Sequence, residues 1–357
     1  MSHPPVVLGL RALNLGDFCT ALPAWKALRR AFPDHRTVLA APGWQRPLVA
    51  LCPAIDELVP TDALAPVSRP VHRAAVTVNL HGRGPESSRL LAASDPGRLV
   101  AFFHDDVVAT IDGPRWDDDE HEVTRWCRLV TTVGAGADPT DLALERPTVA
   151  APRVGATVLH AGASAPARRW PVERWARLAR ALRRRGHDVV LTGTAAELPR
   201  SRRISALADL EPTSDLTGRT GLAELAALVA HARLVVSGDT GTAHLASAYG
   251  TPSVILFGPT PPTTWGPPAA GPHRVLWAGG RGDPHGDAVD PGLLALSVDA
   301  VLAAVDDLTA ADDRAPGPRR RSAKGTVTPS IPGAPELLPV VQPARRAVDD
   351  PVGSTPP

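Results

Sequence analysis

The segment from residue 232 to 257 constrains the fold of this 357-residue chain more than any other. An apolar run, Leu234–Ser237, precedes the polar turn Gly238–Gly241, and a helical pattern then leads to a second apolar run, Ser253–Phe257. Strands that are apolar at almost every position are buried on both faces, as in a parallel sheet. We therefore expect a strand, a tight turn, a helix over Thr242–Tyr249 and a second parallel strand.

This turn is also a candidate binding site. It places Asp239 at the carboxyl end of a strand, and the amides that open the next helix have no intrahelical partner and carry the positive end of its dipole. Such a helix start favours phosphate. Asp239 and Thr240 have an alternative interpretation, because Asp and Thr are frequent helix caps. Similar strand–loop–helix junctions at Gly16–Asp17 and Gly162–Pro171 favour a nucleotide cleft.

Short apolar runs alternate with helical patterns in both halves of the chain, which predicts two parallel α/β sheets. The first half has expected strands and helices at Val6–Leu10, Ala21–Phe32, Thr37–Ala41, Ala75–Leu80, Ser87–Ala93, Val100–Phe103 and Glu120–Val133. The second half has them at Thr157–His160, Val172–Arg185, Asp188–Thr192, Leu222–Ala230, Leu234–Ser237, Thr242–Tyr249, Ser253–Phe257 and Val298–Leu308. We expect domains at 1–150 and 151–311, joined through the Gly- and Pro-rich stretch 134–153, and a disordered Pro-rich tail at 312–357.

Composition and charge exclude several classes of protein. The formal net charge is +1, so no global field recruits nucleic acid. No stretch reaches ~20 apolar residues, and the N-terminus lacks the basic start of a signal peptide, so we expect a cytoplasmic protein. Cys19, Cys52 and Cys127 are far apart and form no CxxC pair; they are expected to be buried thiols, with no disulfide and no zinc site. The basic cluster Arg319–Arg321 is interpreted as a solvated charge run, with a peripheral membrane contact as the alternative.

The two other junctions carry charged side chains. Asp17 follows the first strand and Gly16, and its carboxylate is placed to act as a general base or, alternatively, to cap a helix. Arg168 and Arg169 precede a helix that Pro171 opens. Arginine matches the positive helix start poorly, which indicates an anionic ligand shared by both. No GxGxxG follows any expected strand, which argues against a dehydrogenase.

These motifs together resemble glycosyltransferase family 9, the lipopolysaccharide heptosyltransferase-like enzymes. The resemblance rests on motifs in the family's order between residues 5 and 310, namely Gly16-Asp17 with Leu22-Pro23-Ala24, Gly162-Ala163-Ser164 with Arg168-Arg169-Trp170-Pro171, Asp239-Thr240-Gly241 with His244-Leu245-Ala246, and Phe257-Gly258-Pro259-Thr260. It implies the GT-B fold, in which two Rossmann-like domains face each other across a cleft. It also implies inverting sugar transfer from a nucleotide diphosphate sugar to an acceptor hydroxyl without a metal or other cofactor.

The resemblance assigns roles by position. Asp17 would be the general base, facing the acceptor once the cleft closes, and Arg168 would take the place of the lysine that neutralises the departing diphosphate. The donor would be held by Gly162, Ser164, Arg169, Glu197, Asp239, Thr240, Gly241, Thr242 and His244. Glu197 matches a ribose-binding position. His244 has a buried helix histidine as its alternative interpretation.

The acceptor side is expected at Arg11, Gly16, Asn79 and His81, and Glu122–Trp126 borders it without an assigned role. The donor implied by the best-known relatives is ADP-heptose. The acceptor is expected to be a glycan, a lipid-linked sugar or a small molecule, and the protein a monomer, with at most peripheral contact at the inner face of the membrane. Two alternative functions share this site: a nucleotide-sugar epimerase or hydrolase, and a nucleotide-sugar-binding protein without catalysis.

Overall fold

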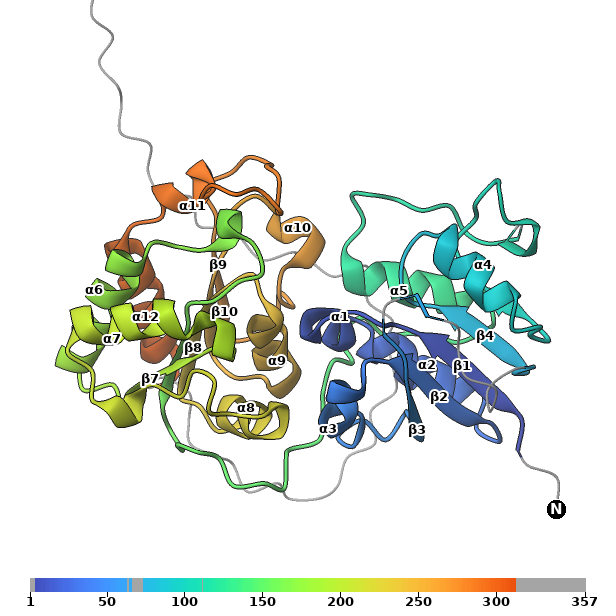
Figure 1. Cartoon of the computed structure of the whole chain (residues 1–357), viewed down its shortest axis with the longest axis horizontal. Helices are drawn as coiled ribbons and strands as arrows, with labels where there is room; N and C mark the ends of the chain where they lie inside the picture. Colours follow the sequence, from blue (N-terminus) through green and yellow to red (C-terminus); the bar gives the residue numbers. More distant parts are fainter. Residues whose placement is uncertain (1–3, 63, 66–72, 111, 313–357) are drawn as a thin grey trace, which may run out of the picture.

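The computed structural model describes residues 4–62, 64–65, 73–110 and 112–312 and contains two parallel five-stranded sheets (Figure 1). The expected α/β class is confirmed. The expected tail, apart from Asp312, lies outside the described residues. Residue 150 lies in an irregular stretch between the two sheets, and residue 311 lies inside the last helix.

The N-terminal sheet has the strand order β3-β2-β1-β4-β5. Its strands are β1 (Val6–Leu10), β2 (Arg36–Ala41), β3 (Glu57–Pro60), β4 (Val76–Asn79) and β5 (Leu99–Val100). In the parallel register, Val7 of β1 pairs with Thr37 on one side and Val76 on the other. The prediction missed β3, and the expected strand 100–103 is shorter, because residues 101–103 leave the sheet.

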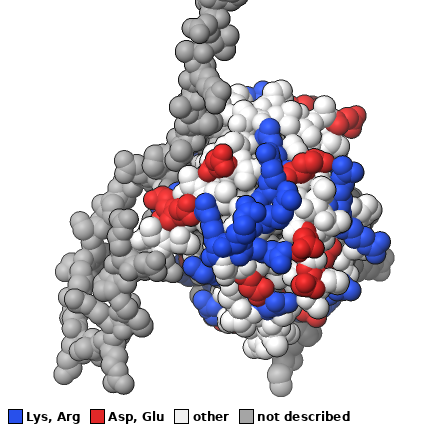
Figure 2. Space-filling view, turned by 90° about the vertical axis from the view of Figure 1, so that its left-hand side faces the viewer, with Lys and Arg blue, Asp and Glu red and all other residues white. Residues whose placement is uncertain are grey.

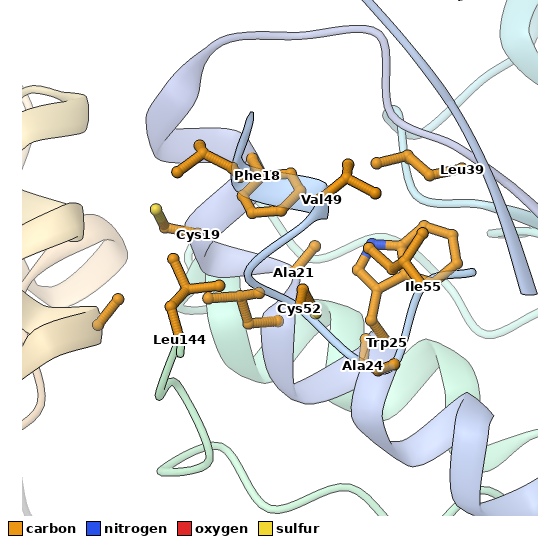
Figure 3. Close-up of a cluster of buried hydrophobic side chains, with 14 of the residues drawn as sticks. Phe18, Cys19, Ala21, Ala24, Trp25, Leu39, Val49, Cys52, Ile55 and Leu144 are labelled. Carbon is orange, nitrogen blue, oxygen red and sulfur yellow. The ribbon is translucent and has the colours of Figure 1, made fainter. Parts of the chain in front are cut away.

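The helices of this half are α1 (Leu15–Thr20), α2 (Leu22–Ala31), α3 (Arg46–Val49), α4 (Glu86–Ala92) and α5 (Glu122–Thr131), with short 3-10 turns η1 (Gly43–Gln45) and η3 (Val108–Thr110). The apolar stripe of α2 packs on the sheet, and Figure 3 shows its Trp25 beside Ile55. Gly9 of β1 makes room for that ring, since a Cβ there would lie 2.3 Å from Trp25 Cη2. The buried cluster fixes α1, and with it the loop after β1.

The C-terminal sheet repeats the design with the order β10-β9-β8-β6-β7. Its strands are β6 (Thr157–His160), β7 (Val189–Thr192), β8 (Leu234–Gly238), β9 (Ser253–Leu256) and β10 (His273–Leu276). Its helices are α6 (Val172–Arg184), α7 (Leu198–Ala208), α8 (Leu222–Ala230), α9 (Gly241–Tyr249), α10 (Pro262–Trp265), α11 (Pro291–Ala295) and α12 (Val298–Asp312), with the 3-10 turns η4 (Pro166–Arg168), η5 (Ala195–Glu197) and η6 (Pro212–Ser214). The prediction missed α7, β10 and the short α10 and α11.

The two halves touch through helices. Helix α1 packs against α9, and α3 packs against α8 (Figure 1). The N-terminal half therefore contacts the helix before β8, which is α8, and the helix after it, which is α9. One cluster of buried apolar side chains joins them and includes Phe18 and Cys19 of α1 with Leu245 and Ala248 of α9. Asp17 lies in helix α1, so its half of the molecule is already in contact with the other half; that it faces the acceptor once the cleft closes stays a prediction.

The remaining expectations concern thiols and membrane spans. Cys19, Cys52 and Cys127 are buried free thiols, as predicted. Burial raises the pKa of Cys52 to about 11 and of Cys127 to about 12, so both are protonated at neutral pH. In the part of the chain that the structure describes, no helix is long and apolar enough to cross a membrane.

Candidate active site

A cleft of about 1080 Å³ lies between the two halves. It runs along the carboxyl ends of β6, β7 and β8, where ligands of open parallel sheets bind. The N-terminal half contributes the first turn of α1 and one side chain of η1; the C-terminal half contributes most of the lining. Of the expected site residues, the cleft is lined by Gly16, Asp17, Ser164, Arg168, Arg169, Glu197, Asp239, Thr240, Gly241, Thr242 and His244.

Asp17 lies in the first turn of α1 with its side chain 19% exposed. Its Oδ2 accepts a hydrogen bond from the Asn14 amide at 3.1 Å, so the helix-start interpretation is correct in part. Its Oδ1 lies 3.5 Å from Arg11 Nη2. Burial raises the pKa of Asp17 above its usual range, and the Arg11 charge opposes this rise. A carboxylate with a raised pKa at a cleft wall is suited to take up a proton.

Arg11 does not line the cleft, which corrects its assignment to the acceptor side. Its guanidinium is buried, donates to the Leu80 and Asp17 carbonyl oxygens, and reaches Thr20 Oγ1 at 3.0 Å and Glu122 Oε1 at 3.1 Å. It also lies over the Trp126 ring, 4.6 Å from the centroid. These contacts use its donors inside the domain. Arg11 therefore positions Asp17 from behind, together with Glu122.

Asn79 and His81 need the same correction. Asn79 is fully buried, and its amide donates to Ser87 Oγ and Ser88 Oγ at 2.9 Å each while its Oδ1 accepts from the His81 amide. His81 is half-buried and outside the cleft lining, and burial lowers its pKa. The Asn79 side chain holds the loop after β4 in place, whereas His81 Nδ1 has no hydrogen-bond partner among the described residues.

On the other wall, Arg168, Asp239 and His244 lie together. Arg168 Nη2 donates to the Asp239 carbonyl oxygen and lies 3.3 Å from its Oδ2. Burial raises the pKa of Asp239, while Arg168 lowers it. Burial and nearby cations lower the pKa of His244 to about 3, so its imidazole is neutral at pH 7. His244 can therefore donate a hydrogen bond to an anion but adds no positive charge.

The first turn of α9 lines the same wall as Arg168, Asp239 and His244. Thr240 is the N-cap residue, yet its side chain makes no capping bond, and its buried Oγ1 has no hydrogen-bond partner among the described residues. The amides of Gly241 and Thr242 begin the helix, where intrahelical acceptors are lacking. Polar groups left unsatisfied in a protein interior are costly. The amides of Gly241 and Thr242 together with the Arg168 guanidinium are suited to bind an anionic group.

Glu197 and the glycines around it form the next part of the wall. Its Oε2 accepts from the Thr194 amide at 2.7 Å, while its Oε1 makes no hydrogen bond within the described part of the chain. A Cβ at Gly162 would lie 1.8 Å from Oε1, so Gly162, which is not in the cleft lining, makes room for this carboxylate. Arg169 lines the cleft but braces its own loop by donating to the carbonyl oxygens of Ala163 and Ser164.

Several lining residues were missed by the sequence interpretation. They are Asn14, Trp44, His160, Arg200, Trp265, His285 and the residues 220–222 and 225 around the start of α8. Trp44 follows β2, so the rule that strand ends face the cleft would have found it. Trp265 lies edge-on to His244, with ring centroids 5.7 Å apart, and nothing in its sequence surroundings indicates that contact. Within the described residues, no group of three or more His, Cys, Asp or Glu side chains is placed to hold a metal ion.

Comparisons with known proteins agree with this geometry. The model of the family "Glycosyltransferase family 9 (heptosyltransferase)" matches residues 113–281, a range that holds Arg168, Glu197 and Asp239 but not Asp17. Lipopolysaccharide heptosyltransferase 2 of Escherichia coli is 24% identical over 304 residues, which cover 73% of this chain and 85% of that protein.

Solved structures share the architecture. The E. coli ADP-heptose lps heptosyltransferase II superposes with a TM-score of 0.70 at 21% identity, covering 86% of this chain and 99% of the other. A glycosyl transferase family 9 protein from Veillonella parvula gives a TM-score of 0.73 at 20% identity, covering 87% and 99%. The ordered motifs, the family match over residues 113–281 and the shared GT-B architecture lead to one conclusion: the chain is a glycosyltransferase similar to those of family 9.

Proposed function

We propose that this enzyme transfers a heptose from ADP-heptose to a hydroxyl group of a glycan acceptor. The observation that carries the proposal is the single cleft in which Asp17 of one half faces Arg168, Asp239 and the start of α9 in the other. The related E. coli protein is described as an ADP-heptose heptosyltransferase, which supports this donor.

The residues on the two walls allow one displacement step. The acceptor hydroxyl loses its proton to the Asp17 carboxylate as its oxygen attacks the anomeric carbon of the donor sugar. The bond from that carbon to the diphosphate oxygen breaks on the opposite face, so the configuration inverts. The electron pair leaves with the nucleoside diphosphate, whose negative charge is stabilised by Arg168 and by the Gly241 and Thr242 amides.

We propose that this step needs no metal ion, because arginine and helix-start amides supply the positive charge that a nucleotide diphosphate leaving group requires. Assays with excess EDTA should retain full turnover. Loss of activity on chelation, restored by adding Mg²⁺ or Mn²⁺, would contradict this part of the proposal without affecting the donor assignment.

The donor assignment is tested by binding and by product analysis. A thermal-shift series of ADP, UDP, GDP and their sugars should show the largest stabilisation with ADP-heptose, since a ligand that binds only the folded state stabilises it by mass action. Mass spectrometry should then show a heptosyl product with a heptose-deficient lipopolysaccharide core fragment. Full consumption of donor without any acceptor would favour an epimerase or hydrolase, and binding without turnover over a broad acceptor panel would favour a binding protein.

We propose further that the enzyme is a cytoplasmic monomer that contacts the inner face of the membrane through α6. Arg174, Arg177, Arg180 and Arg184 of α6 line a groove of about 420 Å³ against α12, and Figure 2 shows the band of basic side chains across this face. Clusters of four to eight such residues attract anionic lipids at about 1 kcal/mol each. The expected cluster Arg319–Arg321 lies outside the described residues.

The membrane contact is tested with vesicles. The triple variant R177A/R180A/R184A should bind vesicles of phosphatidylglycerol more weakly than the wild type, and the difference should shrink at high salt. The control R46A/R83A removes two exposed arginines from the other half. Equal loss in both variants, or binding to neutral phosphatidylcholine, would contradict a site on α6. Light scattering of the purified protein checks the monomer.

A further inference from the structure

Trp44 is the one tryptophan that the structure leaves exposed. Its side chain is 49% exposed, whereas the other seven of the eight tryptophans are buried or half-buried. It lines the cleft, and among the described residues it is the only lining side chain that the N-terminal half contributes besides Asn14 and the first turn of α1. The displacement step described above gives this residue no task.

The backbone around Trp44 is held firmly although the ring is exposed. Trp44 lies in η1, between β2 and α3. The next residue, Gln45, is buried and donates from Nε2 to the Leu13 carbonyl oxygen at 2.7 Å, which ties this turn to the loop that carries Asp17. A fixed turn that exposes a large aromatic ring has the properties of a contact surface for a ligand.

The opposite wall at this end of the cleft is apolar. Helix α3, which follows Trp44 directly, packs against α8. The first turns of α8 contribute Leu222 and Leu225, which are half-buried and one turn apart on the same face, and both line the cleft with Gly221. Trp44 and these two leucines therefore give the cleft an apolar part that both halves line, called the apolar slot below.

The cleft lining contains groups that suit each part of a nucleotide. Arg168 and the start of α9 provide the phosphate end, and the unpaired Oε1 of Glu197 provides an acceptor for a sugar hydroxyl. The apolar slot is the part of the lining that suits a flat ring such as a nucleobase. We infer that Trp44 stacks on the nucleobase of the donor, so that the N-terminal half covers a base bound on α8. The inference rests on the proposed function, because it requires a nucleoside diphosphate donor.

The inference explains how one half of the enzyme would sense the donor bound by the other. A base held between Trp44 and α8 bridges both halves, and the Gln45 bond links that contact to the loop before Asp17. Stacking of a base on an aromatic side chain tolerates base identity, so base selectivity would come from the polar groups near Gly221 rather than from Trp44.

Titrations with ADP test the inference. The W44A variant should bind ADP about 10-fold to 100-fold more weakly than the wild type, the range expected for loss of one base–aromatic stack. W44F should retain most of the affinity, because it keeps a flat ring. The control W277F changes a half-buried tryptophan outside the cleft lining and should bind ADP like the wild type.

Two further measurements separate stacking from a structural role. ADP should quench the indole fluorescence of the wild type and of W277F by the same amount and that of W44F clearly less, because only Trp265 then remains in the cleft lining, although W44F still binds. Pyrophosphate, which has no base, should bind W44A and wild type equally.

The possible failures are distinguishable. If the wild type does not bind ADP, the proposed function fails. If ADP binds W44A as tightly as the wild type, or if W44A weakens pyrophosphate and ADP equally, the stacking inference is overturned. A W44A variant with normal ADP affinity and a raised KM for the acceptor would also overturn it, and would place Trp44 against the acceptor.

Discussion

The two walls of the cleft differ in how many of their polar side-chain atoms have hydrogen-bond partners. Behind Asp17, the donors of Arg11 find acceptors inside the N-terminal half, and Glu122 accepts from Arg11, Arg125 and Trp126. On the C-terminal wall, Arg168 Nε and Thr240 Oγ1 have no hydrogen-bond partner among the described residues. The hydrogen bonds around Arg11 form a saturated network, although Arg125 Nε behind it has no partner among the described residues, and the wall with Arg168 and Thr240 is left open.

This difference suggests different tasks. A saturated network behind a single carboxylate holds it in one orientation, which suits proton transfer. Unsatisfied donors around a buried carboxylate and a helix start suit a ligand that supplies the missing acceptors, as a diphosphate does. The N-terminal wall would then govern turnover, and the C-terminal wall would govern both donor binding and departure of the leaving group.

The D17N variant tests most directly whether the N-terminal wall governs turnover without governing donor binding. We expect kcat to fall by about 10²–10⁴-fold, the usual contribution of a general base, while the Kd for ADP stays unchanged. Stopped transfer assays and calorimetric titration with ADP measure the two quantities. The D34N variant is the control, because Asp34 is exposed and outside the cleft. Transfer at the wild-type rate in D17N would remove Asp17 from the chemistry.

The complementary change on the open wall is R168A. Removing one donor that stabilises a developing negative charge costs about 10²–10³-fold in rate, and here ADP affinity should fall as well because the diphosphate loses a cation. R168K should recover part of both losses, since it restores the charge but not the two-pronged geometry. R177A, which removes an exposed arginine of α6, serves as the control. An R168A enzyme with normal ADP affinity would show that the two walls do not divide the work as argued.

The contact between the walls gives a third comparison. A Cβ at Gly241 would lie 2.6 Å from Leu15 Cβ and 3.0 Å from the Gly16 amide nitrogen, so G241A must push α1 and α9 apart. Overpacking of this kind costs about 1–3 kcal/mol of unfolding free energy. G136A is the matched control, because a Cβ at Gly136 meets no atom within 4 Å. Urea unfolding measures both; equal stability would mean that the two halves separate without cost.

The sequence predicted which strand ends share the cleft better than the direction of each side chain. Asp17, Arg168, Glu197 and Asp239 meet in one cleft because the carboxyl ends of parallel strands share one edge of a sheet. Arg11 also follows a strand, yet its side chain points into the N-terminal half, where Glu122 and the Leu80 carbonyl oxygen accept hydrogen bonds from it. Those partners lie 69 or more positions away in sequence. No local pattern reveals such a partner.

The missed elements have local causes too. Strand β3 contains Glu57 and Pro60, which weaken its apolar pattern. Strand β10 begins with the polar His273, which is buried and forms a hydrogen bond through Nδ1 with Ser253 Oγ at 2.9 Å. Trp44 follows strand β2 closely, but its position in the sequence does not show whether the ring is buried or exposed. The three-dimensional structure shows that the Trp44 ring is exposed in the cleft between the two halves, and this exposure makes it a candidate for ligand contact.

The smallest expected effect tests whether the saturated wall tunes Asp17 as well as holding it. The Glu122 charge raises the pKa of Asp17, so E122Q should lower that pKa. A base with a lower pKa is ionised at lower pH, and the acid limb of the kcat profile should therefore move toward lower pH. The amide oxygen can still accept from Arg11 and Trp126, while the bond from Arg125 to the second carboxylate oxygen is lost; because the contact with Arg11 remains, kcat on the plateau should stay within several-fold. E120Q is the control, because Glu120 pairs with Arg128 and does not act on Asp17. An acid limb that stays in place, or that moves to higher pH, would show that this limb does not report the ionisation of Asp17.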